Sequence, residues 1–368
     1  MTRVLVNPAF PLFIDDHQEL VRLGDLPGTG KVLQSAAPAL RELVRRCAST
    51  ALPRDELVSL TAGIGGVTAA EVDQAITALL TARILVEEQE VELLTRHGPS
   101  SRQALFFSMF QPASRAAEMI GDLAERTVAV LGVGGIGGFV ALQLATAGVG
   151  RLRLVDQDDV DESNLHRQYL YKAEDVGDPK VDTAARRLVE HSPALKVETH
   201  HRTLTGAGDV ADVVAGADLV IATADSPQPQ IRRWTNAGCL AAGVPFLPGG
   251  FTQHLGIAGP LVVPGSSACL ACLDEELRVR NGGRELPAVQ NQGRIIPAFG
   301  PLCSIVAGFL AAEAVRFLTG VVPAALAGRV VHFDLLTMMT AERFVTRLDA
   351  CQVCGDPAES AKRPAPGT

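Results

Sequence analysis

The stretch from Thr127 to Asp156, TVAVLGVGGIGGFVALQLATAGVGRLRLVD, decides the fold. Its apolar run at 127–131 predicts a buried strand, residues 136–147 predict a helix, and 151–156 predict a second strand. A later strand is predicted at 219–222. Strands and helices that alternate in this order are typical of α/β proteins with a doubly wound, Rossmann-like sheet.

The turn between the first strand and its helix is rich in glycine, with Gly132, Gly134, Gly135 and Gly137 in the sequence GVGGIG. Glycines let a phosphate chain approach the backbone, and the start of the helix supplies N–H donors. Asp156 follows Gly132 by 24 residues, at the end of the next strand, where a carboxylate can accept hydrogen bonds from ribose hydroxyls. These residues predict an adenine nucleotide site, and taken alone they favour NAD.

Further polar residues follow the second strand and change this interpretation. They are Asp158, Asn164, Arg167 and Gln168 in QDDVDESNLHRQ, Lys180 in DVGDPK, and Asp225. Arginine and lysine can neutralise charge that develops on an α-phosphate and on departing pyrophosphate, and a carboxylate such as Asp225 can hold Mg²⁺. Hydride transfer needs no such cluster, so the set favours ATP over NAD. For any one of these residues alone, an ordinary surface ion pair would be the favoured interpretation, but the whole set argues against it.

Together with FGPLCSIVAGFLAAEAVRFLTG at 299–320, these motifs resemble the ubiquitin-activating-like adenylyltransferases, the family that includes ThiF, MoeB, HesA and MccB. The resemblance covers about residues 101–354. It implies that Asp156 binds ribose, that Asn164, Arg167 and Gln168 line the phosphates, that Lys180 contacts the α-phosphate, and that Asp225 coordinates Mg²⁺.

Ser101-Arg102-Gln103 is similar to the arginine element of this family, in which an arginine reaches into the ATP site of the partner subunit. The resemblance therefore implies a homodimer in which Arg102 takes part in catalysis.

One motif departs from the family. Where activators of sulfur carriers read DxTDN, this chain has Ala222-Thr-Ala-Asp225-Ser226, which keeps the metal-binding acid but leaves the acceptor open.

Four of the seven cysteines form two CxxC pairs, Cys269/Cys272 and Cys351/Cys354, which 78 residues separate. Two such pairs can present four thiolates to one tetrahedral ion, so they predict a zinc site with no open position. A pair of redox-active dithiols is the alternative. The family resemblance also implies a structural zinc at these cysteines.

The remaining cysteines, Cys47, Cys239 and Cys303, lie among apolar residues and are expected in the core. In relatives that form a thioester, the nucleophilic cysteine lies on a crossover segment, and residues 273–300 of this chain contain none. A reactive thiolate needs exposure and positive surroundings, which the apolar neighbours of Cys303 do not provide. We therefore expect the acyl-adenylate to pass directly to an external nucleophile.

Residues 1–98 are predicted to form a separate, small α+β domain with the outline of a winged helix. The sequence predicts strands at 3–13, 19–23 and 84–86, and helices near 40–47, at 55–61 and after the capping box Thr68-Ala-Ala-Glu71. This order resembles the PqqD-like peptide-recognition domains, which implies capture of a leader peptide as an added strand. Nine basic and thirteen acidic residues within 1–100 argue against DNA binding. A packing or dimerisation module remains the alternative.

The adenylation domain is predicted at 99–355. A linker is expected at 97–101, followed by a helix over 102–123 with a break near Pro112, and the proline-rich residues 356–368 are expected to be disordered.

The composition excludes several classes of partner. With 33 basic and 41 acidic residues, the chain has a net charge of −8, which disfavours nucleic acid. Its longest apolar run is too short to cross a membrane, and the N-terminus has no signal-peptide pattern. A cytoplasmic protein is expected.

The sequence therefore predicts ATP- and Mg²⁺-dependent adenylation of the C-terminal carboxylate of a peptide or of a ubiquitin-like carrier protein. The pathway would be ribosomal peptide natural-product or sulfur-carrier biosynthesis. The alternative is a non-catalytic, ThiF-like scaffold that binds a leader peptide and presents it to a partner enzyme. The presence of Arg167, Lys180 and Asp225 favours the enzyme.

Overall fold

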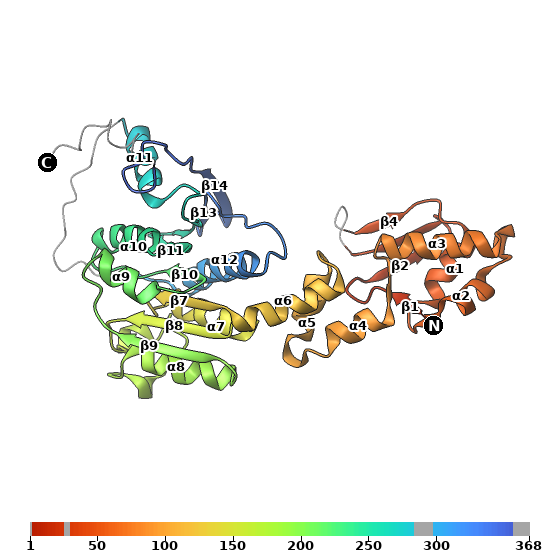
Figure 1. Cartoon of the computed structure of the whole chain (residues 1–368), viewed down its shortest axis with the longest axis horizontal. Coiled ribbons are helices and arrows are strands. Elements are labelled where there is room, and N and C mark those ends of the chain that lie inside the picture. The colour runs from red at the N-terminus through yellow and green to blue at the C-terminus, as the bar shows by residue number, and fades with distance from the viewer. Residues whose placement is uncertain (1, 26–29, 283–296, 356–368) are drawn as a thin grey trace. The chain divides into compact units, whose positions relative to one another are not determined.

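The computed structural model describes residues 2–25, 30–282 and 297–355, and the chain divides into two compact units, Met1–Ile120 and Gly121–Thr368 (Figure 1). The domain limits expected from the sequence, 1–98 and 99–355, stay a prediction. The tail at 356–368, which the sequence predicts to be disordered, lies outside the described residues.

The N-terminal unit contains two three-stranded antiparallel sheets, with the strand orders β5-β1-β6 and β2-β3-β4. Its elements are β1 (Arg3–Val6), β2 (Leu12–Asp15), β3 (Leu20–Leu23), β4 (Lys31–Leu33), α1 (Pro38–Arg46), β5 (Leu52–Pro53), α2 (Arg54–Thr61), α3 (Ala69–Thr81), β6 (Leu85–Glu87), α4 (Glu88–Thr95) and α5 (Ser101–Ser108). The expected winged-helix-like order of strands and helices is therefore present, with three short elements, β4, β5 and α4, that the sequence did not predict.

One predicted strand, at 3–13, is wrong, because β1 and β2 belong to different sheets. The buried Asn7 turns the chain between them: its side-chain oxygen accepts the N–H of Ala9 at 3.0 Å, and its amide nitrogen donates to the carbonyl of Arg83 at 3.2 Å. The predicted capping box is confirmed. Thr68 and Glu71 bond reciprocally at the start of α3, with Thr68 N–H donating to the Glu71 carboxylate at 2.7 Å.

The residues of the expected linker at 97–101 include the 3-10 turn Gly98–Ser100, which leads directly into α5. The predicted break near Pro112 is confirmed, since α5 ends at Ser108 and α6 (Ala113–Glu125) begins after the proline.

The C-terminal unit is built on an eight-stranded sheet with the order β14-β13-β12-β11-β10-β7-β8-β9 (Figure 1). Its strands are β7 (Thr127–Leu131), β8 (Arg151–Asp156), β9 (Lys196–His201), β10 (Leu219–Ala222), β11 (Phe246–Thr252), β12 (Leu255–Ala258), β13 (Arg329–Asp334) and β14 (Met339–Phe344). Its further helices are α7 (Gly137–Ala147), α8 (Lys180–His191), α9 (Ala207–Val214), α10 (Gln230–Ala241), α11 (Leu270–Arg280) and α12 (Gly300–Thr319).

Strands β7 to β11 are parallel, and β12 to β14 extend the sheet antiparallel beyond β11. Ala129 and Leu131 of β7 belong to the apolar core with α9 and α10, whereas α7 contacts α8 and α12. Successive side chains of a strand point to opposite faces of the sheet. These two groups of helices therefore cover both faces of its parallel region. The predicted doubly wound α/β fold is confirmed, and the antiparallel extension adds to it.

The expectation that no apolar run is long enough to cross a membrane is wrong by length and composition alone, because helix α12 passes that test. Of its most apolar window, 56% is buried inside the protein, where the helix contacts α7, β11 and β12. Its apolar character is therefore that of a core helix.

Candidate active site and metal centre

A cavity of about 290 Å³ lies at the carboxyl ends of the parallel strands. The strand order β8-β7-β10 places it where successive connections leave β7 in opposite directions, which is the usual position of a ligand in open α/β sheets. The predicted site residues that line it are Gly132, Gly134, Gly135, Gly137, Asp156, Asp158, Asn164, Arg167, Gln168, Lys180 and Asp225. Arg102 is different, because it lies on α5 in the N-terminal unit and does not line this cavity.

The glycine loop is packed so closely that side chains have no room at two positions. Gly132 has φ +87°, and a Cβ there would lie 2.6 Å from the backbone nitrogen of Ala224. A Cβ on Gly137 would collide with the Gly132 carbonyl and lie 2.5 Å from Thr223 Oγ1. The same hydroxyl donates to the Gly132 carbonyl at 2.9 Å, so the ends of β7 and β10 are joined. Gly134 faces open space, apart from the Gln168 amide at 3.7 Å.

The Asp156 carboxylate holds the two loops on either side of it. It accepts the N–H of Val133 at 2.6 Å and the N–H of Asp158 at 2.9 Å. Burial raises the pKa of Asp156, although these hydrogen bonds and the nearby Lys180 favour the ionised form. The predicted contact with ribose stays a prediction, but the carboxylate lies on the cavity wall where such a contact is possible.

Two buried amides in the cavity wall have hydrogen-bonding capacity to spare. Asn164 is 8% exposed and Gln168 is 5% exposed, and neither amide oxygen has a hydrogen-bond partner among the described residues. An unpaired buried polar atom is costly, so such atoms in a cavity indicate a polar ligand or ordered solvent. The residues present therefore fit a ligand with many polar atoms, such as a nucleotide.

Positive and negative groups share the same cavity. Lys180 is 5% exposed, and its ammonium lies 2.8 Å from the Asp158 carboxylate. The Arg167 guanidinium donates to the Ser163 carbonyl at 2.8 Å, and the carboxylate of Asp225 is exposed. Two cations can stabilise phosphate charge, and a free carboxylate suits a hard divalent ion such as Mg²⁺.

The expected burial of Cys303 is confirmed, since it is 1% exposed. Its sulfur nevertheless forms part of the cavity wall, where a Cβ on Gly135 would lie 3.4 Å from it. Burial raises the pKa of the Cys303 thiol, although the charge of Arg167 acts in the opposite direction. Cys47 and Cys239 are also buried as expected, and burial raises the pKa of each to about 12.

Sequence reasoning missed several lining residues, namely Arg202, Leu204, Thr223, Ile231 and Phe251. Arg202 and Thr223 directly follow the carboxyl ends of the parallel strands β9 and β10. That position is the signal that could have identified them once both strands were predicted.

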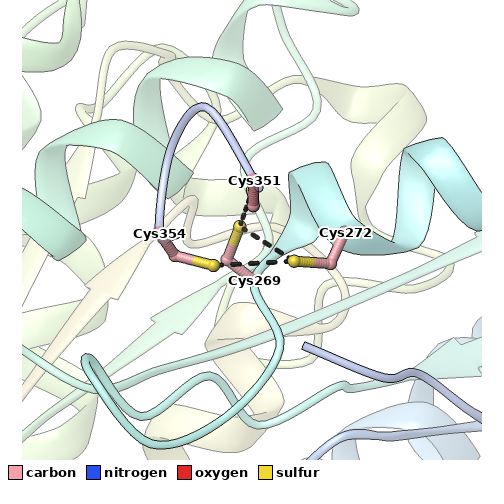
Figure 2. Close-up of side chains that lie close together, drawn as sticks. All are labelled: Cys269, Cys272, Cys351 and Cys354. Atoms are coloured by element: carbon pink, nitrogen blue, oxygen red, sulfur yellow. Dashed lines mark hydrogen bonds between the residues drawn. The ribbon is translucent and has the colours of Figure 1, made fainter. Parts of the chain in front are cut away.

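The second cluster is formed by the two CxxC pairs, whose four sulfur atoms all lie within 4.8 Å of one another (Figure 2). The sulfurs of Cys269 and Cys272 are 4.0 Å apart, those of Cys269 and Cys351 3.8 Å, and those of Cys272 and Cys354 3.5 Å. Four thiolates around a tetrahedral zinc lie about 3.8 Å apart. A hydrogen bond from the Cys269 thiol lowers the pKa of Cys272, which favours a thiolate there. The residues therefore fit zinc.

A model described as the ThiF family matches residues 100–354 of the chain. The chain is 32% identical over 233 residues to the molybdopterin-synthase adenylyltransferase of Escherichia coli (strain K12), which covers 63% of this chain and 88% of that protein. It is also 32% identical over 238 residues to the sulfur carrier protein ThiS adenylyltransferase of the same organism, which covers 63% and 87%.

Among solved structures, E. coli MccB with ATP has a TM-score of 0.76 and 21% identity, and the match covers 96% of this chain and 100% of that chain. The complex of MccB with MccA has a TM-score of 0.78 and 20% identity, with the same coverage. The structural match therefore includes most of residues 1–99, which lie outside the 100–354 match.

Proposed function

Because the chain belongs to the ThiF family and is an adenylyltransferase, we propose that it uses ATP and Mg²⁺ to adenylate the C-terminal carboxylate of a peptide. The observation that carries this proposal is a cavity in which a glycine loop, two cations, an exposed carboxylate and two buried amide oxygens without a hydrogen-bond partner among the described residues meet. The same chemistry on a ubiquitin-like carrier protein is the second candidate, because the ThiS adenylyltransferase is a relative.

The reaction makes a poor electrophile reactive. A carboxylate oxygen of the peptide attacks the α-phosphorus of ATP, the bond to the bridging oxygen of the β-phosphate breaks, and pyrophosphate leaves. Lys180 and Arg167 stabilise the charge that develops on the α-phosphate and on pyrophosphate, while the glycine loop supplies N–H donors. Asp225 would hold Mg²⁺, which supplies further charge stabilisation when bound. The product is an acyl-adenylate that an external amine, thiol or sulfide attacks.

The N-terminal unit supports a peptide as substrate. In its sheet β2-β3-β4, the outer edges of β2 and β4 have no strand partner among the described residues. Phe13 on β2 and Val32 on β4 are exposed at these two edges, at 43% and 47%. An extended peptide can add to such an edge through backbone hydrogen bonds. MccB, whose structure matches 96% of this chain, was crystallised with the peptide MccA.

Three further properties belong to this proposal. Arg102 would act in the ATP site of a second copy, so that the enzyme works as a homodimer. The four cysteines would hold a structural zinc. The enzyme would act in the cytoplasm without a membrane partner, and the net charge of −8 argues against a nucleic acid partner.

Exchange of radiolabelled pyrophosphate into ATP tests the proposed activation. Exchange is expected only in the presence of the cognate peptide, and Asp225→Ala should reduce it by about 100-fold, as for loss of one charge-stabilising group. Asp212→Ala, which changes an exposed acid on α9, is the matched control. Peptide binding without any exchange would favour the non-catalytic scaffold instead.

Hydrogen–deuterium exchange tests the role of the N-terminal unit. Peptide binding should protect backbone amides of β2 or β4, while ATP alone should protect the glycine loop at 132–137. Protection confined to the C-terminal unit would mean that the N-terminal unit only packs or dimerises.

A further inference from the structure

Both the nitrogen and the oxygen of the Asn236 side-chain amide form hydrogen bonds at the start of α11. Asn236 lies on α10 and is 4% exposed. Its nitrogen donates to the sulfur of Cys269 at 3.7 Å, and its oxygen accepts the N–H of Leu270 at 3.0 Å. Leu270 is the first residue of α11, and Cys269, the residue before the helix, makes no side-chain cap of its own. Asn236 therefore caps α11 from another helix and contacts a sulfur of the cysteine cluster at the same time.

Helix α10 also reaches the cavity at the carboxyl ends of the parallel strands. Ile231, in the first turn of α10, lines the cavity and belongs to one apolar core with Cys269, Cys272 and Cys351. The adjacent Arg232 forms an ion pair with Asp274 of α11 at 2.5 Å. Helix α10 is thus fixed to α11 and to the cysteine cluster over the turns that follow the cavity wall.

We propose that Asn236 is a positioning residue that holds the Cys269 thiolate in the metal centre and connects this centre to the cavity wall through α10. Four thiolates around one divalent ion carry excess negative charge, and an N–H donor to sulfur stabilises that charge. Partners that orient metal ligands in this way typically change metal affinity by about 10–100-fold. The inference concerns the metal centre and does not depend on which substrate the enzyme adenylates.

Two substitutions separate the possible roles of Asn236. Asn236→Asp keeps the oxygen that accepts the Leu270 N–H but replaces the N–H donor by an oxygen facing the thiolate. Asn236→Leu removes both hydrogen bonds and introduces no charge. It still tests the proposal if the Asn236→Asp variant fails to fold. Thr235→Val changes the adjacent buried polar residue of α10, which makes no hydrogen bond to a cluster sulfur among the described residues.

The first measurement is the rate at which zinc-loaded, full-length protein transfers its metal to a chromogenic chelator. Both Asn236 variants should release zinc at least about tenfold faster than the wild type, whereas Thr235→Val should not. In cobalt-loaded protein, loss of the donor should also shift the sulfur-to-metal charge-transfer band to lower energy. Unchanged release rates and an unchanged band in both Asn236 variants would overturn the proposal.

The second measurement tests the connection to the cavity by hydrogen–deuterium exchange. Amides in the first turns of α10 should exchange several-fold faster in zinc-loaded Asn236→Leu and in zinc-free wild type than in zinc-loaded wild type. If only the segments at 269–272 and 351–354 respond, Asn236 does not transmit the state of the metal centre, and the connection is refuted.

Discussion

The ammonium of Lys180 lies 2.8 Å from the carboxylate of Asp158, and only 7% of the lysine side chain is exposed. The backbone supports this pair, because the N–H of Lys180 donates to the Asp158 carbonyl at 3.0 Å. A buried ammonium needs a counter-charge, and Asp158 supplies it. Both residues line the cavity, so in the proposed function the lysine is held at a wall that the phosphates of ATP would contact.

Lys180→Ala should reduce peptide-dependent activation of ATP by about 100-fold, because it removes one group that stabilises developing phosphate charge. The rate of pyrophosphate exchange at saturating peptide measures the effect. Lys172→Ala is the matched control: Lys172 is 61% exposed and lies 3.7 Å from Glu174. Equal losses in the two variants would contradict a specific role for Lys180.

Cys303→Ala should retain most of the turnover, because burial raises the pKa of this thiol and the proposed route passes the acyl-adenylate directly to an external nucleophile. Steady-state turnover and mass spectrometry of the quenched enzyme check this expectation. A thiol-sensitive acyl group on Cys303, lost in the variant together with activity, would show the opposite.

Removal of the metal should destabilise the C-terminal unit, since one ion would join Cys351 and Cys354 to the start of α11. We expect about one zinc per chain and a lower Tm after treatment with a chelator. Four thiols should become reactive in the process. Metal-free protein as purified, with all four cluster thiols freely titratable, would contradict the assignment.

The stability of the fold should depend on pH through Asp175, which lies in the loop before Lys180. Burial acts against the ionised form of Asp175, but hydrogen bonds from the Lys172 N–H and from Arg187 hold its pKa below the ordinary value of 3.8. A carboxyl with a lowered pKa stabilises the fold above its ordinary pKa, and this contribution is lost as the pH falls through the folded value.

Asp175→Asn should therefore lower the Tm by several degrees at pH 7, and the difference from the wild type should shrink below about pH 4. Glu174→Gln, which changes the neighbouring carboxyl at 69% exposure, should have little effect. Thermal unfolding of both variants across this pH range provides the check. A difference that stays constant down to pH 2 would rule out the lowered pKa as its cause.

The parts of the fold that could be predicted are those whose sequence carries a local signal. The fully buried β7, the glycine loop and the capping box of α3 each follow from residues next to one another in the chain. Strands β4, β5 and β14 have no such signal. Five of the six residues of β14, namely Met339 to Glu342 and Phe344, are exposed, so its structure depends on pairing with β13.

The candidate site divides in the same way. Its charged residues follow strand ends, and parallel strands bring their carboxyl ends to one edge, so their proximity could be predicted. The hydrogen bond from Asn236 to Cys269 could not be predicted. Asn236 lies 33 residues away in the sequence and meets Cys269 only through the packing of α10 on α11. The position of Cys303 behind Gly135 likewise depends on tertiary packing.

The most direct test of the account follows the carboxylate oxygens. A peptide whose C-terminal carboxylate carries a heavy-oxygen isotope is incubated with the enzyme, ATP, Mg²⁺ and an external nucleophile, and the phosphate products are analysed by mass spectrometry. Attack of the carboxylate on the α-phosphorus predicts one labelled oxygen in AMP and none in pyrophosphate. Label in inorganic phosphate, with ADP as the other product, would contradict adenylation, and unlabelled AMP would mean that the carboxylate is not the group activated.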